Sequence, residues 1–151
     1  MTTTAHGIDG LKELVGTELG TSPPVLVTQE AVNKFADATG DHQWIHVDVE
    51  RARAGPFGGP IAHGYLTLSL LPSLLPTVFQ VEGISMGVNY GLNRLRFPSP
   101  VPVGSEVACT VTLVAVDDVP GGAQVTLATT ITVEGAAKPS CVAEVVFRYY
   151  T

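Results

Sequence analysis

The sequence predicts an α+β fold in which a curved antiparallel sheet wraps around an apolar helix. The run from Tyr65 to Val81 is apolar apart from a few hydroxyl groups and Gln80, and a helix that is apolar on every side is expected to be covered by other protein. The second half of the chain is rich in Val, Thr, Ile and aromatic residues, which favour β-strands. Since the helix and the sheet must each bury an apolar surface, we expect them to pack against each other.

The first half of the chain contains one helix with recognisable ends. A short strand is expected at residues 24–28. Thr28 then resembles a helix N-cap, Glu30 lies in the first turn, and Gly40 is a natural stop. We therefore predict a helix at about residues 29–39.

Shorter elements are expected on either side of the apolar run. Asp48 is placed to cap a second helix that extends to Ala54, and the Gly and Pro residues of 55–60 predict a loop. Turn signals then separate four strand-like segments, which predict an antiparallel meander at residues 93–97, 106–116, 123–133 and 142–149.

The composition indicates a single domain, residues 1–151, that associates with a second copy. A hydrophobic content of 45% is enough for a core, whereas eight basic and 14 acidic side chains cover little of a monomer's surface. We therefore expect a buried homodimer interface. The net charge of −6 argues against a nucleic-acid partner, which would require a basic surface.

Nothing in the sequence predicts a membrane span, a signal peptide or a metal site. Pro72 and Pro76 interrupt the apolar run, which is also shorter than the roughly 20 residues that a spanning helix needs. The N-terminus lacks a basic start followed by an apolar segment, so we expect a cytoplasmic protein. Cys109 and Cys141 have no metal-ligand or redox spacing and are expected to be free, buried thiols.

Asp41 and His46 are the best candidates for chemistry. They lie five residues apart on a short segment just beyond the predicted helix. A carboxylate and an imidazole in this arrangement are able to hold and activate one water molecule. A Gly-rich stretch that ends at Gly64 opens directly onto the apolar helix, where unpaired backbone N–H groups are available to bind a developing oxyanion.

The residues around this pair resemble the signature of the MaoC-like dehydratases, specifically the (R)-specific enoyl-CoA hydratases. The matching residues, in order, are Phe35, Thr39-Gly40-Asp41, Ile45-His46 and Ala52, followed by the segments 60–64 and 96–104. The resemblance implies a hot-dog fold and a homodimer with pockets at the subunit interface. It further implies hydration of trans-2-enoyl thioesters to (R)-3-hydroxyacyl thioesters, with no metal or redox cofactor.

Functional residues carry over from the family one by one. Asp41 and His46 fall on its catalytic pair, and Gly64 falls on the glycine whose N–H binds the thioester carbonyl. Gln43 and Trp44 replace the usual Asn-Pro of the loop, a change that is expected to affect pocket closure or seating of the acyl chain. Where some members carry a Ser eight residues after the glycine this chain has Pro72, and either Ser69, Ser73 or no residue replaces it.

Four further residues are candidates for substrate binding. Phe57, like Trp44, either lines an acyl pocket or fills core, and His63 either contacts a ligand or is a structural donor beside the helix start. Arg94 and Arg96 would share one face of a strand, where they either contact CoA phosphates or form an ordinary solvated edge.

Two alternatives to a hydratase stay open at this point. A hot-dog thioesterase would have the same fold, but such enzymes generally place their acid on the central helix, where this chain has only Ser and Thr. An inactive partner subunit of a heterodimeric dehydratase would be expected to lack the Asp41 and His46 pair. The sequence leaves open the acyl chain length, CoA or acyl carrier protein as carrier, the direction, the pathway, and which member of the pair is the acid.

Overall fold

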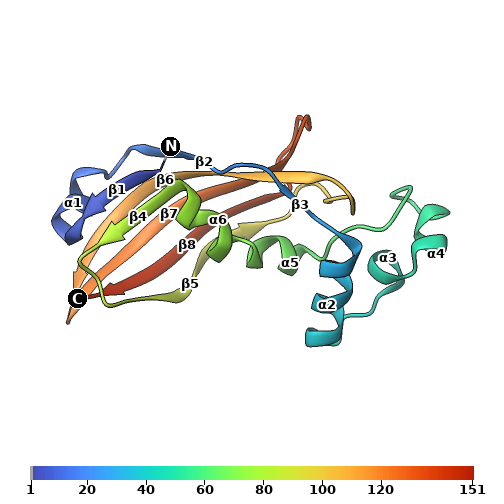
Figure 1. Ribbon diagram of the computed structural model, residues 1–151, viewed down its shortest axis with the longest axis horizontal. Helices are drawn as coiled ribbons and strands as arrows, with labels where there is room; N and C mark the ends of the chain where they lie inside the picture. The colour runs from blue at the N-terminus through green and yellow to red at the C-terminus, as the bar shows by residue number, and fades with distance from the viewer. Residues whose placement is uncertain (1) are drawn as a thin grey trace.

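A computed structural model describes residues 2–151, and its largest feature is a strongly curved six-stranded antiparallel sheet (Figure 1). The strand order is β2-β6-β7-β8-β5, and β3 also pairs with β6. The bounds of these strands are β2 Glu18–Thr21, β3 Val25–Leu26, β5 Met86–Arg96, β6 Glu106–Val119, β7 Gly122–Val133 and β8 Cys141–Tyr150. The three long strands expected in the last third of the chain are confirmed as β6, β7 and β8.

The place of β5 in the sheet differs from the expected meander. It begins at Met86 rather than Asn93, and it pairs with β8 rather than with its neighbour in sequence, β6. Gly87 and Gly91 weaken the strand signal of its first half, which explains the late predicted start. The Pro-rich segment 97–105 then carries the chain to β6, on the other side of the sheet.

The apolar run forms two helices rather than the single long one expected. α5 (Gly64–Ser69) and α6 (Leu71–Val78) meet at Leu70, and the last residues of the run enter strand β4 (Phe79–Glu82). Pro residues are favoured in a first helical turn, where their missing N–H has no intrahelical partner, and Pro72 stands there in α6.

The two helices lie across one face of the sheet and fill the core that was predicted (Figure 1). Their buried side chains are Leu66, Thr67, Leu71, Leu74, Leu75 and Val78. The opposite side of α6, which includes Pro72, Ser73 and Pro76, is exposed. Within a single copy of the chain, the sheet therefore covers only one side of α6, and the expectation of cover on every side was wrong for one copy.

The N-terminal residues form elements that the sequence did not predict. β1 (Thr3–His6) pairs in parallel with β4, and α1 (Gly7–Glu13) follows it. A four-residue strand depends on its tertiary partner, so its own composition carries little signal.

Both cysteines are buried and free as expected, and burial raises the pKa of Cys109 to about 12.

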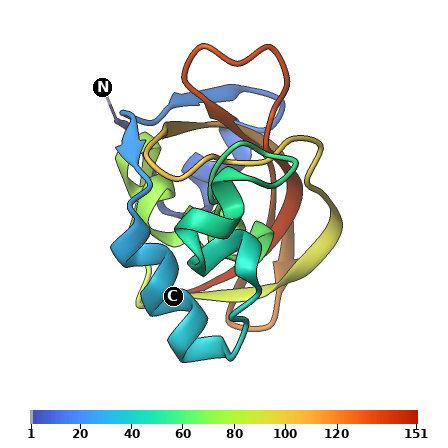
Figure 2. The ribbon, with the colours of Figure 1, turned by 90° about the vertical axis from the view of Figure 1, so that its right-hand side faces the viewer.

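Three helices form a lobe that projects beyond the end of the sheet (Figures 1 and 2). They are α2 (Gln29–Thr39), α3 (Trp44–Val47) and α4 (Val49–Arg53). The predicted ends of α2 are confirmed, because the Thr28 side chain accepts a hydrogen bond from Ala31 N and Gly40 has the left-handed φ of 84°. Asp48 caps α4 as expected, by accepting a hydrogen bond from Arg51 N.

Strand β5 is an exposed edge with an unusual side-chain content. It pairs with β8 on one side, and within residues 2–151 no strand pairs with its other side. Its large hydrophobic side chains are exposed, namely Met86, Val88, Tyr90 and Leu92. Unpaired strand edges with apolar side chains are ready to pair with another chain.

In the part of the chain that the structure describes, no helix is long and apolar enough to cross a membrane.

Candidate active site

The loop that follows α2 and the short helix α3 carry the two members of the predicted catalytic pair. Gly40 ends α2, and Asp41 follows it with an exposed side chain whose Oδ1 accepts a long hydrogen bond of 3.4 Å from Gln43 N. The short helix α3 then turns His46 inward, where its side chain is only 6% exposed. Asp41 is therefore open to solvent, whereas His46 is enclosed.

Backbone and side-chain contacts fix the orientation of His46. Its Nδ1 lies 2.6 Å from the Ile61 carbonyl oxygen, which only accepts, so Nδ1 carries the hydrogen and Nε2 keeps a free lone pair. The Gln29 side chain donates to the His46 carbonyl oxygen at 2.7 Å. Burial lowers the pKa of His46, an effect that the bond to Ile61 partly opposes. His46 is therefore neutral near pH 7 and able to accept a proton at Nε2.

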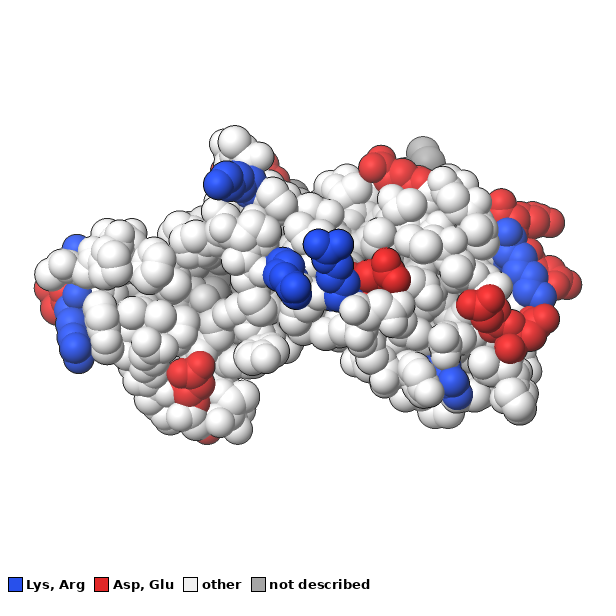
Figure 3. All heavy atoms as spheres, turned by 180° about the vertical axis from the view of Figure 1, so that it is seen from behind, with Lys and Arg blue, Asp and Glu red and all other residues white. Residues whose placement is uncertain are grey.

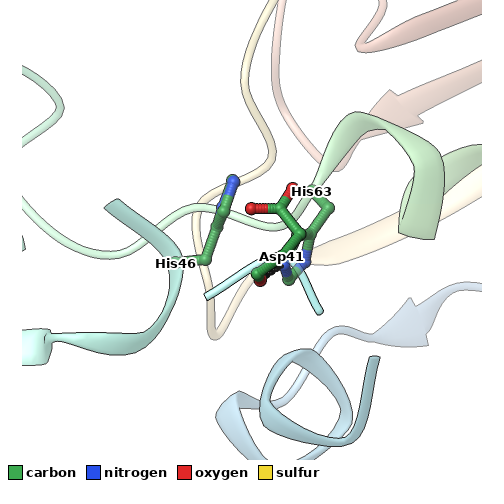
Figure 4. Close-up of side chains that lie close together, drawn as sticks. All are labelled: Asp41, His46 and His63. Carbon is green, nitrogen blue, oxygen red and sulfur yellow. Dashed lines mark hydrogen bonds between the residues drawn. The ribbon is translucent and has the colours of Figure 1, made fainter. Parts of the chain in front are cut away.

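A third residue, His63, completes a cluster with this pair (Figure 4). One potential ligand atom from each of Asp41, His46 and His63 lies within 4.8 Å of the others. The two imidazole rings stack with centroids 3.9 Å apart and planes inclined by 25°. Ring nitrogens direct their lone pairs within the ring plane, so nearly parallel rings do not converge well on one ion. The arrangement suits proton transfer better than metal binding, and the expectation that no metal is needed stays a prediction.

Gly64 lies beside the pair, at the start of α5. As the first helical residue, it has an N–H without an i−4 partner inside the helix. A Cβ at this position would lie 2.9 Å from two ring atoms of Phe97, which is closer than packed side chains allow. Only a glycine therefore fits here without moving Phe97.

A cavity of about 290 Å³ brings His46 and Gly64 together. Phe57 and Phe97 line it as well, together with Ile61, Ala62, Thr67, Pro98, Ser99, Pro100, Val101 and Ser140. The imidazole and the glycine that the sequence suggested for catalysis and carbonyl binding thus face one space. Phe57, a candidate for the acyl pocket, contributes to the same lining.

A larger apolar cavity of about 430 Å³ lies between the two central helices and strands β5 and β8. Its lining includes Pro72 and Ser69, and the hydroxyl of Ser69 donates to the Tyr65 carbonyl oxygen. The hydroxyl of Ser73 likewise donates to the Leu70 carbonyl oxygen. Both hydroxyl hydrogens are therefore used within the helices, and whether either Ser replaces the one found in some relatives stays open.

The remaining predicted residues do not line these cavities. Trp44 packs under the Arg51 guanidinium, whose carbon lies 4.4 Å from the ring centroid, and its neighbour Gln43 is exposed. Trp44 therefore stabilises the lobe. Arg94 and Arg96 are exposed on β5 and, among the described residues, neither forms an ion pair.

Two contacts of the site were not identified from the sequence. Phe97 packs on Gly64, and Gln29 holds the carbonyl of His46. Phe97 stands within one of the segments that resemble the family, which was the available signal for it. Gln29 had no such signal, because it sits at an ordinary position in the first turn of α2.

Sequence comparisons with known proteins point to one family. Residues 11–135 match the family described as MaoC like domain. The chain belongs to the MaoC-like dehydratase family. It is 56% identical, over 97% of both chains, to the 3-hydroxyacyl-thioester dehydratase Z of Mycobacterium tuberculosis.

Solved structures of the family share the fold. The (R)-hydratase from A. caviae is 29% identical, with a TM-score of 0.70 over 87% of this chain and 96% of that one. An R-hydratase from Pseudomonas aeruginosa is 24% identical, with a TM-score of 0.75 over 95% of this chain and 85% of that one. The hot-dog fold expected for this MaoC-like chain is therefore confirmed.

Proposed function

We propose that this MaoC-like protein catalyses the reversible hydration of trans-2-enoyl thioesters to (R)-3-hydroxyacyl thioesters, without a cofactor. The observation that carries the proposal is the cavity shared by His46 and Gly64, together with the Asp41 carboxylate, which has an oxygen within 4.8 Å of a ring nitrogen of His46. The 56% identity to a 3-hydroxyacyl-thioester dehydratase supports the same reaction. Two statements stay predictions, namely that residues 1–151 form one domain and that the protein acts in the cytoplasm.

The proposed reaction uses each of these groups. Water attacks C3 of the enoyl thioester while His46 accepts one of its protons at Nε2. The acid–base pair returns a proton to C2, so the elements of water add across the double bond. Negative charge that develops on the thioester oxygen is stabilised by the Gly64 N–H, and one such donor contributes about 3–4 kcal/mol. In this scheme His46 is the base, and its proton reaches C2 either directly or through Asp41.

The substrate has an apolar end and an anionic end, and the surface offers a place for each. The 430 Å³ cavity has a mainly apolar lining and adjoins α5, so we propose that it receives the acyl chain. Arg94 and Arg96 have no ion-pair partner among residues 2–151 and lie in the strand that leads to Phe97, and we propose that they contact the phosphates of CoA or of an acyl carrier protein.

Hydration of crotonyl-CoA and longer enoyl-CoAs tests the proposal directly. We expect the absorbance of the conjugated thioester to fall, and chiral analysis to find the (R)-3-hydroxyacyl product. A thiol reagent in a parallel reaction measures released CoA, because a thioesterase would free the thiol and leave the double bond intact. Predominantly (S) product, or CoA release without hydration, would contradict the proposal.

We further propose a homodimer in which a second copy covers the exposed β5 edge. The surface supports this, because charged side chains are sparse on the face shown in Figure 3 and large apolar side chains are exposed along β5. Sedimentation at low micromolar concentration is expected to show a dimer.

A pair of variants locates the proposed interface. Val88→Lys places a charge on β5 and is expected to shift the protein to monomer with a parallel loss of activity. Val114→Lys, at a similarly exposed valine on β6, is the matched control and is expected to remain dimeric. An active wild-type monomer would contradict the proposed dimer.

A further inference from the structure

His63 is the most enclosed titratable residue of the site, with a side chain only 2% exposed. It immediately precedes Gly64, and its Nε2 lies 2.9 Å from the backbone carbonyl oxygen of Asp41, 22 residues earlier in the chain. One face of its ring stacks on His46, and Phe35 packs against it at a centroid distance of 4.8 Å. This one side chain thus contacts both members of the acid–base pair.

The hydrogen bonds of His63 assign its tautomer. The Asp41 carbonyl oxygen only accepts, so the hydrogen must be on Nε2 of His63. Its Nδ1 is then an acceptor, and it is buried without a partner in the described part of the chain. A buried polar atom without a partner destabilises the folded state. A phenyl ring would fill the same space without that cost, so the feature of histidine that is used here is the Nε2–H donor.

The bond from His63 matters because Asp41 has few other restraints. Its side chain is exposed, its Oδ1 has the 3.4 Å contact with Gln43 N as its one hydrogen bond within residues 2–151, and Gly40 precedes it. Asp41 is thus joined through His63 to α5, the helix that starts at Gly64. A displacement of about 1 Å in a catalytic group can lower turnover about a hundredfold.

We propose that His63 is a positioning residue that holds the Asp41 backbone with its Nε2–H and supports the His46 ring with its face. The carboxylate, the imidazole and the Gly64 N–H are thereby kept in one rigid arrangement. His63 does not line the cavity that contains His46, so it acts through the other residues and not on the substrate. This inference rests on the proposed hydratase function.

Two substitutions separate the parts of the proposal. His63→Phe keeps a ring against His46 and removes the donor to Asp41, whereas His63→Gln retains an amide N–H that reaches the same carbonyl. We expect His63→Phe to lower kcat for crotonyl-CoA hydration by about tenfold to a hundredfold while KM changes less than about threefold. His63→Gln is expected to keep kcat within about fivefold of wild type.

Thr129→Val is the matched control, because Thr129 is also 2% exposed and donates to a backbone carbonyl oxygen, that of Ala143, at 2.8 Å. It is expected to lower the melting temperature and leave kcat unchanged. Equal kcat losses in His63→Phe and His63→Gln, or wild-type kcat in His63→Phe, would overturn the proposal. If His63→Phe does not fold, His63→Asn replaces it, since that shorter amide does not reach the Asp41 carbonyl.

A measurement without substrate separates this inference from the proposed function. Imidazole ¹⁵N NMR of the wild-type protein is expected to show a hydrogen on Nε2 of His63. An Nε2 without a hydrogen would overturn the inference even in an active hydratase. If the hydrogen is on Nε2 but the protein hydrates no enoyl-CoA, the proposed function is wrong, whereas the hydrogen bond from His63 to Asp41 exists.

Discussion

Asp41→Asn and His46→Gln are each expected to lower kcat for enoyl-CoA hydration by at least about a hundredfold. Both substitutions keep the approximate shape of the side chain and remove its capacity to exchange a proton, which typically contributes 10²–10⁴-fold to the rate. Neither is expected to unfold the protein. Asp41 is exposed, and Gln at position 46 keeps most of the volume of the buried imidazole. Initial rates are measured on samples with matched melting temperatures.

His42→Gln is the matched control for this pair. His42 lies on the same loop, but its side chain is exposed and its Nε2 contacts Asp37 at 2.9 Å, away from the cluster. It is expected to keep wild-type kcat. If Asp41→Asn or His46→Gln retained more than about a tenth of wild-type activity, the acid–base assignment would be wrong.

The sequence predicted those parts of the site that depend on local chemistry. The helix that ends at Gly40 and the cap at Asp48 follow from side chains that bond to nearby backbone, so short stretches of sequence contain the signal. Asp41 and His46 are only five positions apart, Asp41 on the loop that follows α2 and His46 within α3. The structure therefore places them in one cluster, as their spacing suggested.

The parts that were not predicted depend on contacts between distant segments. Strand β5 pairs with β8, although other strands of similar composition are present in the chain. Strand β1 forms only by pairing with β4, which lies more than 70 residues away in sequence. The role of His63 belongs to the same class. The sequence left open whether it was a ligand contact or a structural donor, because its partners, Asp41 and His46, are brought to it by the fold.

Gly64→Ala is the second substitution with a large expected effect, a loss of about a hundredfold in kcat. The φ angle of Gly64 is not in the left-handed region, so backbone strain is not the reason. The added Cβ would lie 2.9 Å from the ring of Phe97, which lines the same cavity as His46. Either Phe97 moves into the cavity or α5 shifts, and both displace the N–H from the thioester oxygen. Steady-state kinetics with crotonyl-CoA measures the loss.

The double variant Gly64→Ala/Phe97→Ala separates the two reasons for the glycine. Removing the phenyl ring makes room for the Cβ, so α5 is able to keep its position. If close approach of the thioester carbonyl to the backbone is what requires glycine, the double variant stays slow while Phe97→Ala alone is affected less, because only the former carries a methyl group beside the N–H. Recovery of the double variant to the rate of Phe97→Ala would show that glycine is needed at position 64 only for packing against Phe97, because the backbone N–H of residue 64 is still available to the thioester oxygen.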